Sequence, residues 1–134
     1  MGHWVEVEHT ADLSLHVWGD DLVDLFATAA RGMFSLVAEA GGEGLGPARR
    51  VALTALDVET LLVDWLNELL YLHEVERVVI VEVAFERLTE TQLEAEVRGT
   101  PVGERLAQIK AVTFHNLVVT SGPDGYEAEL VFDV

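Results

Sequence analysis

Two aspartates and the last residue of the sequence could bring three carboxylates together. Asp12 lies in a short polar break, His9-Thr10-Ala11-Asp12, and Asp133 is one residue from the end. The terminal carboxylate of Val134 would lie beside the Asp133 side chain, and Asp12 would join them if the first strands pair near the last strand. Three carboxylates with no Lys or Arg nearby in sequence repel one another unless a hard cation lies between them. Ligands made only of oxygen favour Ca²⁺, Mg²⁺ or Mn²⁺ over Zn²⁺ or Cu²⁺.

Ordinary structural roles are the alternative for both aspartates. An Asp in a turn often accepts a hydrogen bond from its own backbone, which would account for Asp12. Asp133 would be an acid on a frayed tail if the last segment were not ordered. The alternating pattern that continues through Phe132 instead indicates an ordered strand at that point. The spacing by itself leaves the cation site and the structural roles open.

Lys110 and the histidines are the basic candidates for chemistry. Lys110 is the single lysine, so the other seven of the eight basic residues are arginines. It could orient a phosphate or pair with an acid near the carboxylates, or it could be an ordinary lysine at the end of a strand. The five histidines lack the HxH or HxxxH spacing of a zinc site. His9 remains a candidate for contact with a partner or a phosphate because it lies in the same polar break as Asp12.

Several common catalytic arrangements are absent from the sequence. It contains no GxSxG, HExxH, GxGxxG or EF-hand pattern. It also contains no Cys, which excludes disulfides, thiolate metal sites and cysteine nucleophiles. These absences weaken the case for an enzyme without excluding one.

Composition limits the class of partner. The chain has 134 residues, 50% of them hydrophobic, and carries 24 acidic against 8 basic side chains for a net charge of −16. We expect one folded domain over 1–134, because this chain is too apolar to be disordered. Direct binding to nucleic acid or to an anionic membrane is not expected, since both depend on Lys and Arg. The acidity suits a basic protein partner or a cation, or else it serves solubility.

Two helices and seven strands would position these residues. Alternating or β-branched runs predict strands at 5–8, 13–18, 51–56, 78–85, 93–97, 110–120 and 126–134. Val5 and Val7 are expected to face inward on the first of them. Helical periodicity predicts a helix over 22–37, with acidic residues at its start, and a second that Asp57 caps and that runs to about His73. Asp64, Asn67 and Glu68 would give this second helix one wet face.

The order of these elements predicts the fold class. The sequence β-β-α-β-α-β-β-β-β is typical of an α+β fold, here two helices packed on a largely antiparallel β-sheet in a single two-layer domain. The stretch from Ser121 to Gly125 predicts a hairpin between the last two strands. No stretch approaches the roughly 20 apolar residues of a membrane span, and the charged start lacks the apolar core of a signal peptide. We therefore expect a cytoplasmic protein.

Five separated segments of the sequence resemble the archease family. They are His9-Thr10-Ala11-Asp12, Val17-Trp18-Gly19 with the helix that ends in Gly32-Met33-Phe34, the helix segment Trp65 to Tyr71, the segment Lys110 to His115, and the terminal Phe132-Asp133-Val134. The segments occur in the same order as in the family and span essentially the whole chain. Residues 103–109 match the family pattern least closely.

The resemblance implies an accessory factor and not an enzyme. Archeases are small acidic proteins that assist the RtcB-type RNA ligase in tRNA splicing and RNA repair, by promoting metal-dependent guanylylation and multiple turnover of the ligase. The family's metal site matches Asp12, Asp133 and the terminal Val134. Two other classes stay open: a chaperone-like binding module with a divalent-cation site, which would need an exposed apolar patch, and a metal-dependent hydrolase, for which the sequence offers no nucleophile and base.

Overall fold

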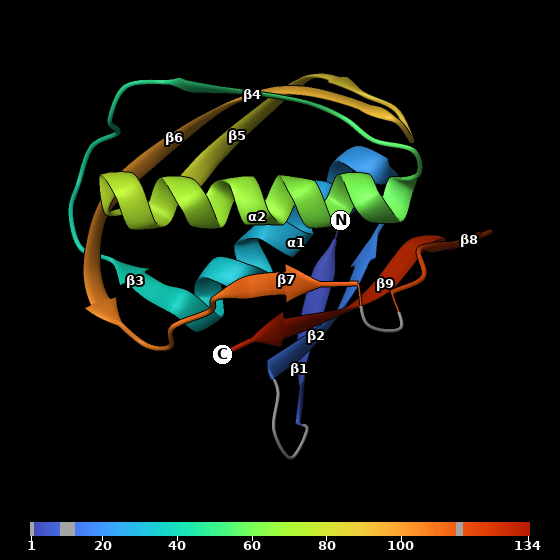
Figure 1. The fold of residues 1–134 in the computed structure, drawn as a ribbon, viewed down its shortest axis with the longest axis horizontal. Coiled ribbons are helices and arrows are strands. Elements are labelled where there is room, and N and C mark those ends of the chain that lie inside the picture. The colour runs from blue at the N-terminus through green and yellow to red at the C-terminus, as the bar shows by residue number, and fades with distance from the viewer. Residues whose placement is uncertain (1, 9–12, 115–116) are drawn as a thin grey trace.

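The computed structural model describes residues 2–8, 13–114 and 117–134 of the chain (Figure 1). It contains two helices and nine strands among these residues. The strands are β1 (His3–Glu8), β2 (Leu13–Gly19), β3 (Ala38–Ala40), β4 (Arg49–Thr54), β5 (Val78–Leu88), β6 (Gln92–Arg105), β7 (Ala111–Thr113), β8 (Thr120–Gly122) and β9 (Gly125–Asp133). The helices are α1 (Leu22–Val37) and α2 (Val58–Glu76). The predicted α+β class with two helices and antiparallel strands is confirmed.

The strands form two sheets that flank the helices. The five-stranded sheet has the order β1-β2-β9-β7, with β8 also paired to β9, and the four-stranded sheet has the order β3-β6-β4, with β5 also paired to β6. Helix α1 contacts β2 of one sheet and β5 of the other, and α2 contacts β4, β5 and β7. The helices therefore lie between the sheets (Figure 1). The alternating pattern of a strand shows which residues share a face, but not which strands pair with it. The sequence therefore did not show that the strands form two sheets.

Both helices begin at an aspartate that accepts hydrogen bonds at the helix N-terminus. Asp21 accepts a bond of 2.8 Å from the backbone N–H of Asp24, and Asp57 accepts one of 2.8 Å from that of Thr60. Bonds from the side chain and backbone of Thr60 hold the pKa of Asp57 below its ordinary value. These caps satisfy N–H groups that have no partner within the helix. The predicted cap at Asp57 is confirmed.

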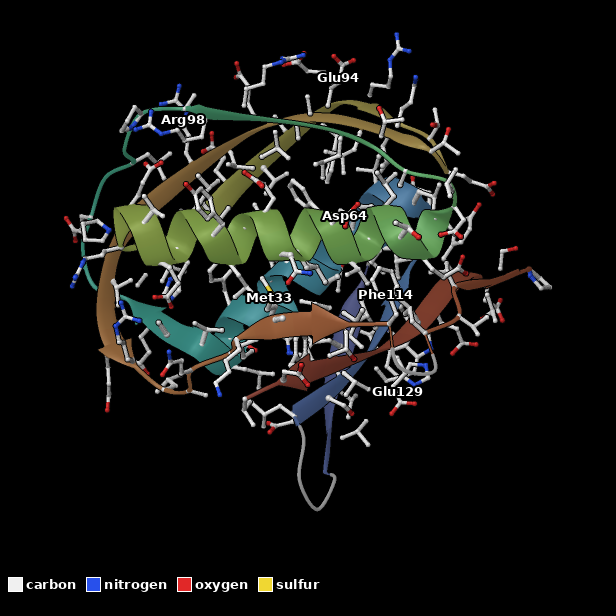
Figure 2. All side chains as sticks on the ribbon, in the orientation of Figure 1. Met33, Asp64, Glu94, Arg98, Phe114 and Glu129 are labelled. Atoms are coloured by element: carbon white, nitrogen blue, oxygen red, sulfur yellow. The ribbon has the colours of Figure 1, made fainter. Side chains whose placement is uncertain are left out.

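The core fills the space between the sheets. Leu15 and Val17 of β2 and Leu130 and Phe132 of β9 are each fully buried. Trp65 of α2 lies at its centre, also fully buried. Acidic side chains lie outside this core: Figure 2 shows Glu94 on the outer side of the four-stranded sheet and Glu129 on the outer side of the five-stranded sheet.

Strand β1 faces the opposite way from the sequence prediction. Val5 pairs with His16 on the outer face and is 53% exposed, whereas Trp4 pairs with the buried Val17. The expectation that Val5 and Val7 face inward was wrong. The reason is Gly32 of α1, whose missing side chain leaves room for the Trp4 ring to pack against the helix.

The predicted strand over 110–120 is interrupted. Strand β7 and the first residue of β8 fall within that range, and the described residues between them, 114 and 117–119, are irregular. Among these irregular residues, the backbone N–H of Val119 donates to the Glu59 side chain of α2, and that of Leu117 donates to the Phe114 carbonyl oxygen. The structure also adds the short β3 after α1, whose three residues are too few for an alternating pattern. The predicted hairpin is confirmed: Gly122 pairs with Gly125, which adopts a positive φ of 111°.

No helix among the residues that the structure describes is long and apolar enough to cross a membrane.

Candidate metal and partner site

Three segments of the chain meet at one end of the five-stranded sheet. Ala111 of β7 pairs with Asp133 of β9, and the backbone N–H of Lys110 donates a hydrogen bond of 2.8 Å to the Asp133 carbonyl oxygen. On the other side of β9, Leu13 of β2 pairs with Phe132. The end of β9 thus lies between the start of β7 and the start of β2. This pairing is the condition under which the sequence analysis expected Asp12 to approach Asp133.

Asp133 occupies an exposed position on the outer face of the sheet. Strand β9 alternates as expected, with Ala128, Leu130 and Phe132 buried and Asp133 exposed. Val134 follows it and is 51% exposed. The carboxylate of Asp133 is therefore accessible to a ligand or to a partner from solvent.

Two of the predicted site residues, Asp12 and His9, lie outside the described residues. The structure does not test whether they approach Asp133. Within 2–8, 13–114 and 117–134, no group of three or more His, Cys, Asp or Glu side chains is placed to hold a metal ion. A cation site at this end of the sheet must therefore include a residue from the remaining positions or the main chain.

The backbone of Lys110 is hydrogen-bonded to that of Asp133. The residue is exposed, and its side chain forms no ion pair with the part of the chain that the structure describes. The expectation that Lys110 pairs with an acid is therefore not met by any described carboxylate. The ammonium group remains available to a ligand that approaches this end of the sheet.

The charges of the two sheets differ strongly. Strands β1, β2, β7, β8 and β9 contain no Lys or Arg, whereas β4, β5 and β6 carry five arginines. All five of these arginines pair with glutamates: Arg49 with Glu76, Arg50 with Glu86 and Glu94, Arg87 with Glu94, Arg98 with Glu82, and Arg105 with Glu74. The five-stranded sheet therefore has the more negative outer face, and Asp133 lies on it. Lys110, which precedes β7, is the basic residue next to that face.

Helix α2 positions the segment that follows Lys110. The Asn67 side chain accepts a hydrogen bond of 2.9 Å from the N–H of Val112 and donates one of 3.3 Å to its carbonyl oxygen. Farther along, Glu59 accepts a bond of 2.9 Å from the backbone N–H of Val119. Asn67 thus takes the place of a neighbouring strand at the open edge of β7. This contact ties Val112, two residues after Lys110, to α2.

Sequence reasoning missed this role of Asn67. It interpreted the polar residues of the second helix as a solvated face, but Asn67 is half-buried against β7. The available signal was its type: an amide offers both a donor and an acceptor, which a carboxylate or an ammonium group does not. Its partner could not be predicted, because Val112 lies 45 residues away in sequence.

Replacing Asn67 by Ala is expected to loosen β7 without unfolding the protein. The change removes two hydrogen bonds at a partly buried edge, for a loss of about 1–2 kcal/mol in the free energy of unfolding. Hydrogen exchange of the Val112 amide, followed by NMR, should accelerate by about tenfold. Asp64→Ala on the same helix is the control and should leave that amide unchanged. Unaltered protection of Val112 in the Asn67 variant would show that β7 is held by β9 alone.

The donor set at the end of β9 fits an oxygen-ligated divalent cation. Asp133 supplies carboxylate oxygens at an exposed position, on a sheet whose strands lack competing Lys and Arg. No histidine is described at this end of β9, which disfavours zinc or copper there. Residues Asp133 and Val134, with Asp12 beyond the described range, are those that would hold Ca²⁺, Mg²⁺ or Mn²⁺.

The chain is similar in sequence to proteins of one known family. The model of the archease protein family (MTH1598/TM1083) matches residues 4–134. The chain is 37% identical over 136 residues to the protein archease of Methanosarcina acetivorans, covering 96% of this chain and 93% of that protein. It is 30% identical over 143 residues to the protein archease of Pyrococcus abyssi, covering 100% of both chains.

Solved structures share the same fold. The solution structure of Methanobacterium thermoautotrophicum protein 1598 has a TM-score of 0.75 and 27% sequence identity, covering 98% of each chain. The crystal structure of a Thermotoga maritima archease, described as a possible chaperone, has a TM-score of 0.70 over 96% of this chain and 94% of that one. Its sequence identity of 20% supports a common fold alone.

Proposed function

The chain belongs to the archease family, and from this premise we propose that it is an accessory factor of an RtcB-type RNA ligase in tRNA splicing and RNA repair. In this role it promotes the metal-dependent guanylylation of the ligase and allows multiple turnovers, and it does not join RNA itself. The observation that carries the proposal is the meeting of Asp133, Lys110 and the start of β2 at one exposed end of the five-stranded sheet.

The charge of this sheet supports a partner with a positive or metal-rich surface. Asp133 lies on a sheet whose strands lack Lys and Arg, in a chain of net charge −16. Opposite charges accelerate association and orient the partners as they meet. The same charge disfavours direct binding to RNA, whose phosphates would be repelled. The proposal therefore places the contact between protein and ligase, in the cytoplasm.

The acidic end would act at the active site of the ligase. Asp12, Asp133 and Val134 would hold a divalent cation, which when bound supplies positive charge close to phosphate oxygens. Lys110 adds a second positive charge beside Asp133 and would orient a phosphate of GTP. The hydrogen bond from the Lys110 N–H to the Asp133 carbonyl oxygen holds the main chains of the two residues next to each other. The ligase keeps its own nucleophile, so this chain needs none.

A turnover experiment tests the proposal. Joining of a broken RNA by a matched ligase is measured with GTP and Mn²⁺, with and without substoichiometric amounts of this protein. We expect the ligase alone to stop after about one turnover and the mixture to continue for many. The protein alone should join no RNA and hydrolyse no GTP. An unchanged ligase in the mixture would reject the accessory role.

A chaperone-like binding module is the second candidate. It is favoured by exposed apolar side chains: Tyr71 and Val75 lie one turn apart on α2 and are each 59% exposed, and Phe114 after β7 is 55% exposed. This candidate predicts binding of a dye for apolar surfaces and suppression of aggregation in an unrelated unfolding protein. A protein that fails both assays but supports ligase turnover has the accessory role only.

A further inference from the structure

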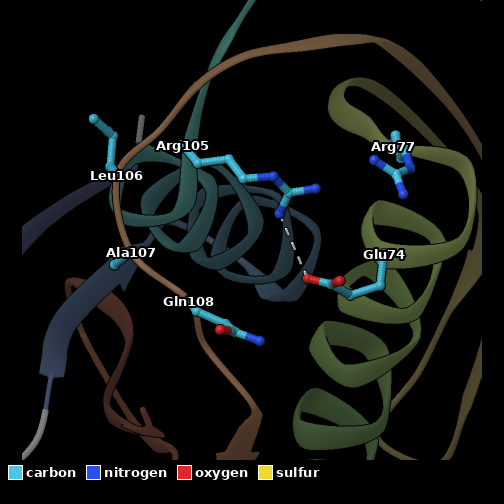
Figure 3. A pocket seen from close by; sticks show the side chains of 6 residues that line it. All are labelled: Glu74, Arg77, Arg105, Leu106, Ala107 and Gln108. Carbon is cyan, nitrogen blue, oxygen red and sulfur yellow. Dashed lines mark ion pairs between the residues drawn. The ribbon is translucent and has the colours of Figure 1, made fainter.

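A cavity lies where the C-terminal end of α2 faces the loop after β6. Its volume is about 400 Å³, and it is lined by Glu74, Arg77, Arg105, Leu106, Ala107 and Gln108. Figure 3 shows Arg105 and Gln108 on the loop side and Glu74 and Arg77 on the helix side. In a chain with only eight basic residues, two arginines around one cavity form a local concentration of positive charge. Neither Lys110 nor Asp133 lines the cavity.

Arg77 has an unusual backbone conformation. It ends α2 in the left-handed region, with φ 54° and ψ 52°, and it is the only residue other than glycine with a positive φ among those described. Glycine is the usual residue at this position after a helix, because a Cβ atom raises the energy of the left-handed conformation. The chain therefore places a guanidinium group where a glycine would be more stable.

The guanidinium group of Arg77 is unpaired among the described residues, and that of Arg105 forms one long ion pair. The Arg77 side chain forms no hydrogen bond or ion pair with the described residues. Arg105 forms an ion pair with Glu74 at 3.8 Å, a distance that is too long for a hydrogen bond (Figure 3). The neighbouring acid Glu76 is already bonded through both oxygens to Arg49. Glu74 is the one acidic residue among those that line the cavity.

The backbone on both sides of the cavity is held in place. The carbonyl oxygen of Arg77 accepts a bond of 3.1 Å from Val102, which ties the end of α2 to β6. The N–H groups of Leu106 and Ala107 both donate to the carbonyl oxygen of Val37, at 2.9 and 3.3 Å. Both arginines therefore project from fixed segments, and a ligand would not have to order a loop in order to bind.

We propose that Arg77, Arg105 and Gln108 form a binding site for a phosphate group, either free inorganic phosphate or the phosphate of a small nucleotide. Guanidinium groups match the oxygens of phosphate with pairs of hydrogen bonds. The volume falls within the range of sites for small molecules. Because the C-terminal end of a helix carries partial negative charge, binding depends on both guanidinium groups and not on the helix.

The key variant is Arg77→Gly, in which stability and binding should move in different directions. It removes the guanidinium group and relieves the strained backbone, so the melting temperature should stay the same or rise. Phosphate affinity should fall by about tenfold or more, the usual effect of losing a hydrogen bond to a charged group. Arg105→Gln should weaken binding similarly. Arg87→Gln removes the same charge on the outer face of β5, 58% exposed, and is the control.

Binding is measured by calorimetric titration at constant pH and ionic strength, with inorganic phosphate, guanosine monophosphate and guanosine as separate ligands. The proposal expects saturable binding of at least one phosphate ligand, none of guanosine, and normal binding in Arg87→Gln. Tighter binding of the monophosphate than of phosphate identifies a nucleotide as the source. No saturable binding, equal binding in Arg77→Gly, or equal loss in Arg87→Gln overturns the proposal. No ligase is present, so the outcome is independent of the proposed accessory function.

Discussion

Asp133→Asn is expected to lower ligase turnover to the level measured without this protein. The amide has the shape of the carboxylate, and the bond from Lys110 uses the main-chain carbonyl of residue 133, so the end of β9 should keep its structure. The change removes a negative charge and an anionic oxygen ligand at an exposed position. Affinity for Mn²⁺ should fall by about tenfold or more, since hard divalent cations depend on charged oxygen ligands. Multiple-turnover RNA joining and titration with the metal measure the two effects.

The matched control is Asp124→Asn. Asp124 lies in the turn between β8 and β9, at the other end of the strand from Asp133, and the substitution changes the net charge equally. It should leave both turnover and metal affinity unchanged. Asp12→Ala, by contrast, should abolish activation as Asp133→Asn does, with the fold intact. Full activation by either Asp12→Ala or Asp133→Asn would exclude the acidic site from the function of the protein.

Part of this site could be predicted from the sequence. Alternation along the last strand placed Asp133 on the outer face, because the positions of Leu130 and Phe132 require a buried face. The neighbourhood of Lys110 and Asp133 depends on which strands pair, and alternation carries no information on pairing. The cavity between Arg77 and Arg105 could not be predicted either, since the two residues lie on different elements. The left-handed backbone of Arg77 could not be predicted because arginine rarely adopts that conformation.

The elements that were predicted best have a capping residue and a regular apolar pattern in their own sequence. Asp57 and the apolar periodicity after it determine α2 locally, and the structure has the helix begin at Val58. The prediction of a continuous strand over 110–120 failed because contacts distant in sequence determine the structure there. These residues have strand character, but the backbone N–H of Val119 donates to the Glu59 side chain of α2 and not to a neighbouring strand. Tertiary contacts of this kind override a local preference for regular structure.

Trp65→Ala is expected to cause the largest loss of stability of any single change in the core. The side chain is fully buried, its Nε1 donates a hydrogen bond of 3.1 Å to the carbonyl oxygen of Phe26, and its ring lies 5.2 Å from that of Phe85. Trp65 thus joins α2 to α1 and to β5. Its truncation should lower the free energy of unfolding by about 3–5 kcal/mol through cavity formation. Denaturant unfolding measures the change.

Two further variants separate the contributions to this loss. Trp65→Phe keeps most of the packing and removes the indole N–H, so it should cost about 1–2 kcal/mol. Tyr71→Ala removes an aromatic ring from the exposed side of the same helix, where it is 59% exposed, and should change stability by about 0.5 kcal/mol or less. Since folded domains of this size are stable by only about 5–15 kcal/mol, Trp65→Ala alone would leave α2 poorly fixed between the sheets. Helix α2 also carries Asn67, so the contact of α2 with Val112 of β7 depends on the same buried tryptophan.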